Sequence, residues 1–451
     1  MAAAATRPRS APLIAAAAIR PVPLNATVVA VLLLAVTVVA AQAPPHRAPV
    51  AHRATASGFS AARLARLDRV LQEAVDRQRV AGAVALVLRD GRTVYERSVG
   101  WRDREAGQKM TTDTIFRIAS QSKAITSTAV LALVEEGRIG LTQPVSAFIP
   151  AFQKTTVAVT KNDATAVVPA AREITIADLL THTAGISYGV EPVVAAQYEA
   201  SGLGPAAGYG WYTADKDEPI CASMERLASL PFVAQPGEAW VYGYNTDVLG
   251  CVVERASGMP LDRFVETRIT GPLGMTDTHF FLPADKRARL AAVYGNTPDG
   301  GLVRAPDGAK GQGSYVDGPR RSFAGGAGLL STARDYARFL EMIRLGGAID
   351  GVRVLAPRTV KLMTTNQSGT LHSTTGLGYG YGFETTDRFG ASGMSSVGSF
   401  GWGGAYGTIY RVDPEARLTM VLMIQLLPNL TDLRPMFITM VYQALVERGR
   451  D

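Results

Sequence analysis

The sequence FRIASQSKAIT, residues 116–126, is the starting point because it contains a pair of residues that can do chemistry. Ser120 lies three positions before Lys123, and both have apolar neighbours. The following residues, AITSTAVLALVEEG, have helical character, and a helix that begins near Ser120 places both side chains on one face. The N-terminus of that helix would also offer backbone N–H groups and the positive end of the helix dipole.

Two interpretations of this pair are open from the residues alone. Lys123 could be an ordinary solvated lysine on a helix surface. Alternatively, it could activate Ser120, because a serine hydroxyl is a poor nucleophile until a base takes its proton. A neighbouring lysine can be that base or can support one. Pairs with this spacing also occur by chance, so the choice between the two interpretations depends on other parts of the chain.

Two later stretches could supply the missing partners. PGEAWVYGYNTDVLG, residues 236–250, places Tyr242, Tyr244 and Asn245 just before a predicted helix. A tyrosine beside an ammonium can act as a general base, although tyrosines in such places more often pack or cap. SFGWGGAYGTIY, residues 399–410, is a glycine-rich entry into a strand. Such a strand allows a ligand to approach closely, and its N–H groups could stabilise an oxyanion.

Both ends of the chain predict a hairpin and a helix. An amphipathic helix over residues 61–78 precedes two β-rich runs that flank Asp90-Gly91, a strong hairpin signal. Near the C-terminus two further runs flank Asp413-Pro414-Glu415, and a closing helix is predicted over 433–449. The pattern favours an α+β fold in which one antiparallel sheet is built from both termini and covered by helices.

The middle of the chain, roughly residues 120–390, is predicted to be mainly helical and inserted between these terminal parts. Residues 155–173 form an exposed β-rich excursion in this prediction, and 331–347 form a capped helix. No internal repeat is apparent after residue 58. Residues 59–451 are therefore expected to form one domain.

Composition excludes several classes of function. The 451 residues are 47% apolar and 19% charged, which indicates a folded chain with a large core. A net charge of +7 without a basic block gives no support for a nucleic-acid partner. There is no Cys/His cluster, so neither a metal nor another cofactor is expected. Cys221 and Cys251 are expected to be free thiols, although an oxidising compartment would permit a disulfide.

The N-terminus has the features of an export signal. Three arginines precede the apolar run ATVVAVLLLAVTVVAA, residues 26–41, which is bounded by small residues. We expect a signal peptide over residues 1–41, a flexible lead-in over 42–58 and a periplasmic or secreted protein. The alternative is an uncleaved membrane anchor, because the run approaches the minimum length of a span. In that case the N-terminal segment would be the protein's only contact with a membrane.

Together, the serine–lysine pair, the tyrosine before a helix and the glycine-rich strand resemble the three-part signature of penicillin-recognising serine hydrolases. The chain resembles the β-lactamase-related serine hydrolases. Within them it is most similar to the family VIII carboxylesterases, relatives of class C β-lactamases and DD-peptidases. The resemblance covers about residues 60–448 and includes ITIADLLTHTAGISYG, residues 174–189, and GGAGLLSTARDYARFLEMIRLGG, residues 325–347.

The resemblance implies a role for each matching residue. Ser120 would be the nucleophile that accepts the acyl group, Lys123 would support proton transfer, and Tyr242 would be the general base. The backbone N–H groups of Ser120 and of Ala405, in the final strand, would form the oxyanion hole. Trp402-Gly403-Gly404 takes the place of the family's Lys-Thr-Gly triad. His182 is part of a scaffold segment, and we interpret it as structural.

Two departures from the family pattern bear on the substrate. Tyr242-Gly243-Tyr244 has no asparagine in third place, and Asn245 comes one position later. Tyr244, Asn245 and the Trp402 triad are therefore predicted to contact substrate. Tryptophan in place of lysine removes a cation that binds the carboxylate of a β-lactam. Both departures favour a neutral small-molecule ester with a hydrophobic acyl group over an anionic lactam. The alternatives are a β-lactamase or D-alanyl-D-alanine carboxypeptidase acting on an amide, and a non-catalytic binding protein.

Overall fold

The computed structural model describes residues 57–161, 164–204, 215–308 and 311–446. The expected signal peptide, residues 1–41, and most of the expected lead-in, 42–58, lie outside these ranges. Within them, no helix combines the length and the apolar composition that a membrane span needs.

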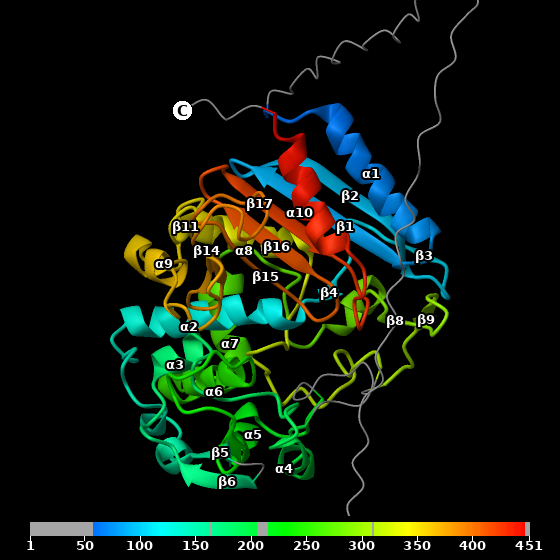
Figure 1. Cartoon of the computed structure of the whole chain (residues 1–451). Coiled ribbons are helices and arrows are strands. Elements are labelled where there is room, and N and C mark those ends of the chain that lie inside the picture. The colour runs from blue at the N-terminus through cyan, green and yellow to red at the C-terminus, as the bar shows by residue number, and fades with distance from the viewer. Residues whose placement is uncertain (1–56, 162–163, 205–214, 309–310, 447–451) are drawn as a thin grey trace, which may run out of the picture. The chain divides into compact units, whose positions relative to one another are not determined.

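The central feature is an eight-stranded antiparallel sheet with the strand order β13-β14-β15-β16-β17-β1-β2-β3 (Figure 1). Strands β1, β2 and β3 come from the N-terminal part of the chain, and the other five strands come from the C-terminal part. The strands are β1 (Gly82–Arg89), β2 (Arg92–Asp103), β3 (Gln108–Lys109), β13 (Leu377–Tyr379), β14 (Glu384–Thr386), β15 (Phe400–Gly403), β16 (Ile409–Asp413) and β17 (Leu418–Met423).

The two termini meet in the middle of this sheet, as the sequence predicted. Strand β1 pairs with β17 in the register that places Val84 opposite Met423. Asp90 and Gly91 make the β1–β2 turn with positive φ angles of 52° and 72°, the conformation that two-residue hairpin turns require. Strands β13 and β14 lie inside the region that was predicted to be helical, so that region ends near residue 376 and not near 390.

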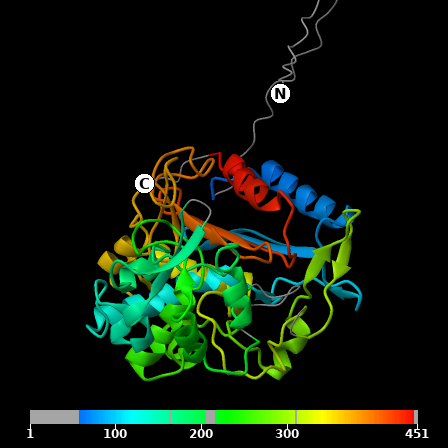
Figure 2. The ribbon, with the colours of Figure 1, turned by 60° about the horizontal axis from the view of Figure 1, so that its bottom comes forward.

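Helices cover both faces of the sheet. Helix α1 (Ala61–Asp76) and helix α10 (Leu433–Ala444) lie side by side on one face, as the turned view in Figure 2 shows. Helix α8 (Ala333–Arg344) packs on the other face against β17, β1 and β16. Every residue of β1 is buried for this reason: Ala83, Ala85 and Val87 join the core under α1 and α10, whereas the alternate residues join the larger core.

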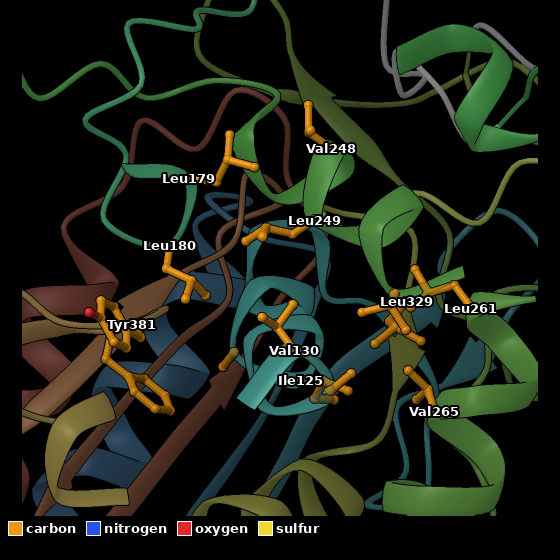
Figure 3. Close-up of a cluster of buried hydrophobic side chains, with 14 of the residues drawn as sticks. Ile125, Val130, Leu179, Leu180, Val248, Leu249, Leu261, Val265, Leu329 and Tyr381 are labelled. Carbon is orange, nitrogen blue, oxygen red and sulfur yellow. The ribbon is translucent and has the colours of Figure 1, made fainter. Parts of the chain in front are cut away.

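Helix α2 (Ser122–Glu135) runs through the larger core and is buried on nearly all sides. Figure 3 shows Ile125 and Val130 of α2 surrounded by apolar side chains from neighbouring helices. The other helices are α3 (Ile176–Leu180), α4 (Ala195–Ala200), α5 (Ile220–Leu227), α6 (Asn245–Ser257), α7 (Leu261–Val265) and α9 (Pro357–Met363). The burial of α2 on nearly all sides is the pattern expected of a helix in the centre of a large core.

Short strands complete the structure. The predicted β-rich excursion is a hairpin of β5 and β6, and β7 pairs with β5 in parallel. Strand β4 pairs with β10 and fixes the residues just before Ser120. The remaining strands are β4 (Phe116–Arg117), β5 (Thr156–Lys161), β6 (Ala164–Pro169), β7 (Pro231–Phe232), β8 (Tyr294–Asn296), β9 (Leu302–Arg304), β10 (Leu330–Ser331), β11 (Ala348–Ile349) and β12 (Val352–Arg353).

The expectation of two free thiols was wrong, because Cys221 and Cys251 form a disulfide. Cys221 lies on α5 and Cys251 on α6, and these helices pack together so closely that the two Cα atoms are 4.9 Å apart. Thirty residues separate the cysteines in sequence, and that spacing alone does not reveal which helices become neighbours.

Candidate active site

Ser120 lies in a short 3₁₀ turn, Ala119–Gln121, that leads directly into α2. Ala119 has a φ of +44°, a conformation that residues with a Cβ atom rarely adopt. Strained backbone of this kind is often found at functional positions. Lys123 follows one turn later and its Nζ lies 3.4 Å from the Ser120 Oγ. The structure therefore places the pair on one face of a helix start, as the spacing predicted.

Lys123 is completely buried, which contradicts the interpretation as a solvated surface lysine. Its Nζ donates to the Tyr188 hydroxyl at 2.9 Å, to the Gly326 carbonyl at 2.9 Å and to the Ser120 Oγ at 3.4 Å. These acceptors occupy the three hydrogens of the ammonium group. A buried lysine is retained only where such partners satisfy it.

Tyr242 is the second predicted residue that the structure brings to this point. The Lys123 Nζ lies 4.6 Å from the centre of the Tyr242 ring. The Tyr242 hydroxyl accepts a hydrogen bond of 3.1 Å from the Trp402 indole Nε1. An ammonium and an N–H donor that both face a phenol stabilise negative charge on its oxygen. Ser120, Lys123, Tyr242 and Trp402 thus come from three separate segments and meet at one place.

Tyr188 was missed by the sequence reasoning, although its hydroxyl contacts Lys123 directly. Its ring also packs edge-on against Tyr242, with the ring centres 5.7 Å apart. The available signal was the stretch THTAGISYG, residues 181–189, which also contains the candidate His182. A tyrosine six residues from a candidate histidine is weak evidence without the fold.

His182 is structural, in agreement with its interpretation from the sequence. Its ring is buried, and its Nδ1 accepts a hydrogen bond of 2.9 Å from the Asn245 Nδ2. Burial, with a smaller effect from the charge on Lys123, holds the pKa of His182 well below its usual range. The imidazole is therefore neutral at physiological pH, with its Nδ1 already occupied.

The prediction that Tyr244 and Asn245 contact substrate is corrected by their positions. Tyr244 is completely buried and its hydroxyl donates to the Leu203 carbonyl at 2.6 Å. Asn245 begins α6, is also completely buried, and bonds His182 together with the carbonyls of Ile186 and Val241. The Asn245 Nδ2 therefore braces the backbone around Tyr242, and the burial of the whole side chain places it away from the surface where a substrate would arrive.

The glycines after Trp402 allow strand β15 to approach the turn that carries Ser120. A Cβ atom on Gly404 would lie 2.5 Å from the Ile118 carbonyl oxygen, so only glycine fits. Gly403 is the last residue of β15. Ala405 was expected within a strand, but it lies exposed in the turn between β15 and β16. The backbone tightens there to return the chain to β16, and the role of the Ala405 N–H in an oxyanion hole stays a prediction.

An aromatic wall surrounds Tyr242 and Trp402. The Trp240 ring stacks on Tyr242 with 5.6 Å between the ring centres, and Tyr379 packs edge-on against Trp402 at 5.4 Å. His372 packs against Trp240 at 4.5 Å. Trp240, Tyr379 and His372 were not predicted, because their approach depends on the fold. The wall surrounds the candidate base with aromatic rings, while Lys123 lies over the Tyr242 ring and His372 contacts Glu384.

Within residues 57–161, 164–204, 215–308 and 311–446, no three side chains of histidine, cysteine, aspartate or glutamate gather in a way that could hold a metal ion.

Known proteins resemble this chain over most of its length. The family described as Beta-lactamase matches residues 67–444. Protein Rv1367c from Mycobacterium tuberculosis is 37% identical over 385 residues, which cover 80% of this chain and 90% of the relative. Esterase EstB from Burkholderia gladioli is 35% identical over 385 residues, which cover 82% of this chain and 92% of the esterase.

A solved structure shares the fold. EstCE1, described as a hydrolase with promiscuous acyltransferase activity, superimposes with a TM-score of 0.72 at 26% sequence identity. The match covers 85% of this chain and 98% of EstCE1. These likenesses confirm the predicted α+β fold and the predicted resemblance to family VIII esterases.

Proposed function

The chain belongs to the Beta-lactamase family and is a serine hydrolase of the carboxylesterase type, and from this premise we propose that it cleaves neutral carboxylic esters with a hydrophobic acyl group through an acyl-enzyme on Ser120. The observation that carries the proposal is the completely buried Lys123, whose ammonium lies 3.4 Å from the Ser120 Oγ and 4.6 Å from the Tyr242 ring centre. A buried ammonium between a serine and a tyrosine is an arrangement suited to activating the serine.

Proton transfer begins at Ser120. Because Lys123 donates to the Ser120 Oγ, the serine hydroxyl hydrogen can point to another acceptor. In the proposal that acceptor is the Tyr242 oxygen, whose negative charge is stabilised by Lys123 and by the Trp402 indole N–H. The Ser120 Oγ then attacks the ester carbonyl carbon, and a C–O bond forms as the proton moves to Tyr242.

The tetrahedral intermediate collapses when its carbon–oxygen bond to the alcohol breaks. Backbone N–H groups of Ser120 and Ala405 would hold the oxyanion. Tyr242 returns the proton to the departing alcohol, and water then attacks the acyl-enzyme by the same route in reverse. The products are the alcohol and the carboxylic acid, and Ser120 regains its proton.

The ester preference rests on Trp402. An indole in this place offers an apolar surface, and its N–H is already bonded to Tyr242. It therefore supplies no cation to a substrate carboxylate. A charge-assisted hydrogen bond of that kind is worth about 1.5–3 kcal/mol. A β-lactam or a D-alanyl-D-alanine peptide on the same site remains the second candidate, and a non-catalytic binding protein the third.

A fluorophosphonate probe tests the nucleophile, and Ser120→Ala is the control. We expect labelling of the folded protein on the peptide that contains Ser120 and none in the variant. Absence of labelling in the wild-type protein would exclude the acyl-enzyme and favour the binding protein.

A substrate panel tests the second part of the proposal. We expect nitrophenyl butyrate to be turned over at least about tenfold faster than nitrocefin or a D-alanyl ester, as the lost charge-assisted contact implies. Comparable turnover of nitrocefin would move the assignment to a β-lactamase.

We also propose that the protein is exported, on the support of the apolar run at residues 26–41. Fractionation of cells that express the full chain, followed by N-terminal sequencing, tests this proposal. A mature terminus near residues 40–43 in the periplasm or the medium is expected. A full-length chain in the membrane fraction would indicate the anchored alternative.

A further inference from the structure

Asp247 is a completely buried carboxyl group that the proposed reaction does not use. It lies in the first turn of α6, five residues after Tyr242. Acidic residues are common in the first turn of a helix because the helix dipole favours them. That preference does not explain the burial, since an exposed position in the same turn would gain the same benefit at a lower desolvation cost.

The carboxylate contacts Lys123 through a single residue, Gly326. The Asp247 Oδ1 accepts a hydrogen bond of 3.0 Å from the Gly326 backbone N–H. The carbonyl oxygen of Gly326 accepts the hydrogen bond of 2.9 Å from the Lys123 Nζ. The N–H of Gly326 therefore bonds the Asp247 carboxylate, and the carbonyl of Gly326 bonds the Lys123 ammonium.

The fit around this residue is tight. A Cβ atom on Gly326 would lie 2.5 Å from the Asp247 Oδ2, and one on Gly325 would lie 2.6 Å from the Thr246 carbonyl oxygen. The Thr126 hydroxyl of α2 also donates to the Gly325 carbonyl at 2.8 Å. The Gly325–Gly326 segment is therefore held against both α2 and α6, and the Gly326 carbonyl has one position relative to Lys123.

Lys123 is the charged side chain that acts on Asp247 within the described part of the chain. Burial raises the pKa of Asp247 to about 6, while the charge on Lys123 and the Gly326 N–H oppose this increase. The Oδ2 is buried and has no hydrogen-bond partner among the described residues. His182, Tyr188 and Tyr242 face Lys123 and do not contact the carboxyl.

We propose that Asp247 is a positioning residue for Lys123: it fixes the Gly326 carbonyl that holds the ammonium, and its negative charge attracts the ammonium to its place beside Ser120 and Tyr242. This inference rests on the proposed function, because it assigns Lys123 a task in the reaction. A carboxylate with so few hydrogen bonds is unfavourable for folding, and such groups are often retained for function.

The variant Asp247→Asn separates charge from shape. Its side-chain oxygen can still accept from the Gly326 N–H, but the negative charge is gone. We expect kcat for nitrophenyl butyrate at pH 8 to fall by about tenfold or more, with KM changed less than about twofold.

A matched control is available on the next helix. Asp262 of α7 is half-buried, burial raises its pKa, and its Oδ1 also lacks a hydrogen-bond partner among the described residues. Asp262→Asn should leave kcat and KM unchanged. A fall in kcat of equal size in both variants would show a general effect of removing a buried carboxyl and would overturn the proposal.

The remaining outcomes are distinguishable. If the wild-type protein is labelled at Ser120 but Asp247→Asn keeps the wild-type kcat, the role of Asp247 is wrong and the proposed function stands. If the wild-type protein is neither labelled nor active, the proposed function itself fails. If Asp247→Asn and Asp247→Ser both lack a cooperative unfolding transition, Asp247 is required for folding and the positioning role is overturned.

Discussion

Two cations are buried on either side of Ser120, and they are held in different ways. Arg117 donates to the carbonyl oxygens of Ala291 at 2.6 Å and Gln312 at 2.9 Å. Lys123 donates to two hydroxyl groups, of Ser120 and Tyr188, and to one carbonyl. Backbone carbonyls cannot exchange a proton, whereas hydroxyl groups can. Burial alone therefore does not identify a reactive cation, but the chemistry of its acceptors does.

The types of residue agree with this difference. A guanidinium does not lose its proton in proteins and offers five donors in a fixed plane, which suits a permanent link between backbone segments. Arg117 makes this link between β4 and the segments that contain Ala291 and Gln312. An ammonium has three donors on a flexible stem and can take part in proton transfer. We therefore expect Arg117 to contribute to stability and Lys123 to activity.

The largest expected effect follows from the loss of Lys123. Lys123→Met should lower kcat/KM for nitrophenyl butyrate by about a thousandfold or more, since the support for proton transfer is lost. The urea concentration at the unfolding midpoint should change little, because the methionine side chain fills most of the volume that the lysine side chain occupied. Lys361→Met, at an exposed position on α9, is the control and should be silent. Activity within about tenfold of wild type would contradict the role of Lys123.

The converse change at Arg117 should affect stability. Arg117→Met leaves the buried carbonyls of Ala291 and Gln312 without their donor, which should cost about 3 kcal/mol or more in the free energy of unfolding. Urea unfolding at pH 7.5 measures this loss, with the exposed Arg358→Met as the control. When kcat is calculated for the folded protein that the fluorophosphonate probe labels, it should stay within a few-fold of the wild-type value. If Arg117→Met lowered kcat without lowering the free energy of unfolding, it would contradict the assignment of Arg117 to stability.

Asp247 is expected to oppose stability while it supports activity. Its pKa is raised in the folded state, so the folded protein bears a cost once the carboxyl ionises. Below about pH 4 the group is protonated in both states and costs nothing, whereas above pH 6 the full cost is present. Asp247→Asn should therefore be more stable than wild type at pH 7.5, by up to about 3 kcal/mol, and the gain should vanish by about pH 4. Urea unfolding at both pH values measures the difference, and a variant that is less stable at pH 7.5 would contradict it.

The smallest effect is expected at the aromatic wall. Trp402→Phe keeps an apolar ring but removes the N–H that donates to Tyr242. The loss of one hydrogen bond corresponds to about 1 kcal/mol, so kcat should fall by about fivefold. Trp101→Phe on β2 is the control. Unchanged kcat in Trp402→Phe would mean that the indole acts only as a surface for the substrate.

The sequence predicted those parts of the site that depend on local spacing. Ser120 and Lys123 are one helical turn apart, so their approach follows from the start of α2. The β1–β2 hairpin is similarly determined by Asp90-Gly91. Tyr188 and Gly326 approach Lys123 only after α2, α6 and the glycine segment have packed together. For the same reason the disulfide was predicted incorrectly and Tyr244 was assigned to the substrate.

The pairing of β1 with β17 also constrains when the enzyme can become active. Residues 82–89 cannot complete their side of the sheet until residues 418–423 have been synthesised. Trp402, which bonds Tyr242, also comes about 280 residues after Ser120. Such long-range contacts give a topology of high contact order, which folds slowly. A nascent chain would therefore carry Ser120 and Lys123 without a complete site until Trp402 and residues 418–423 have been synthesised.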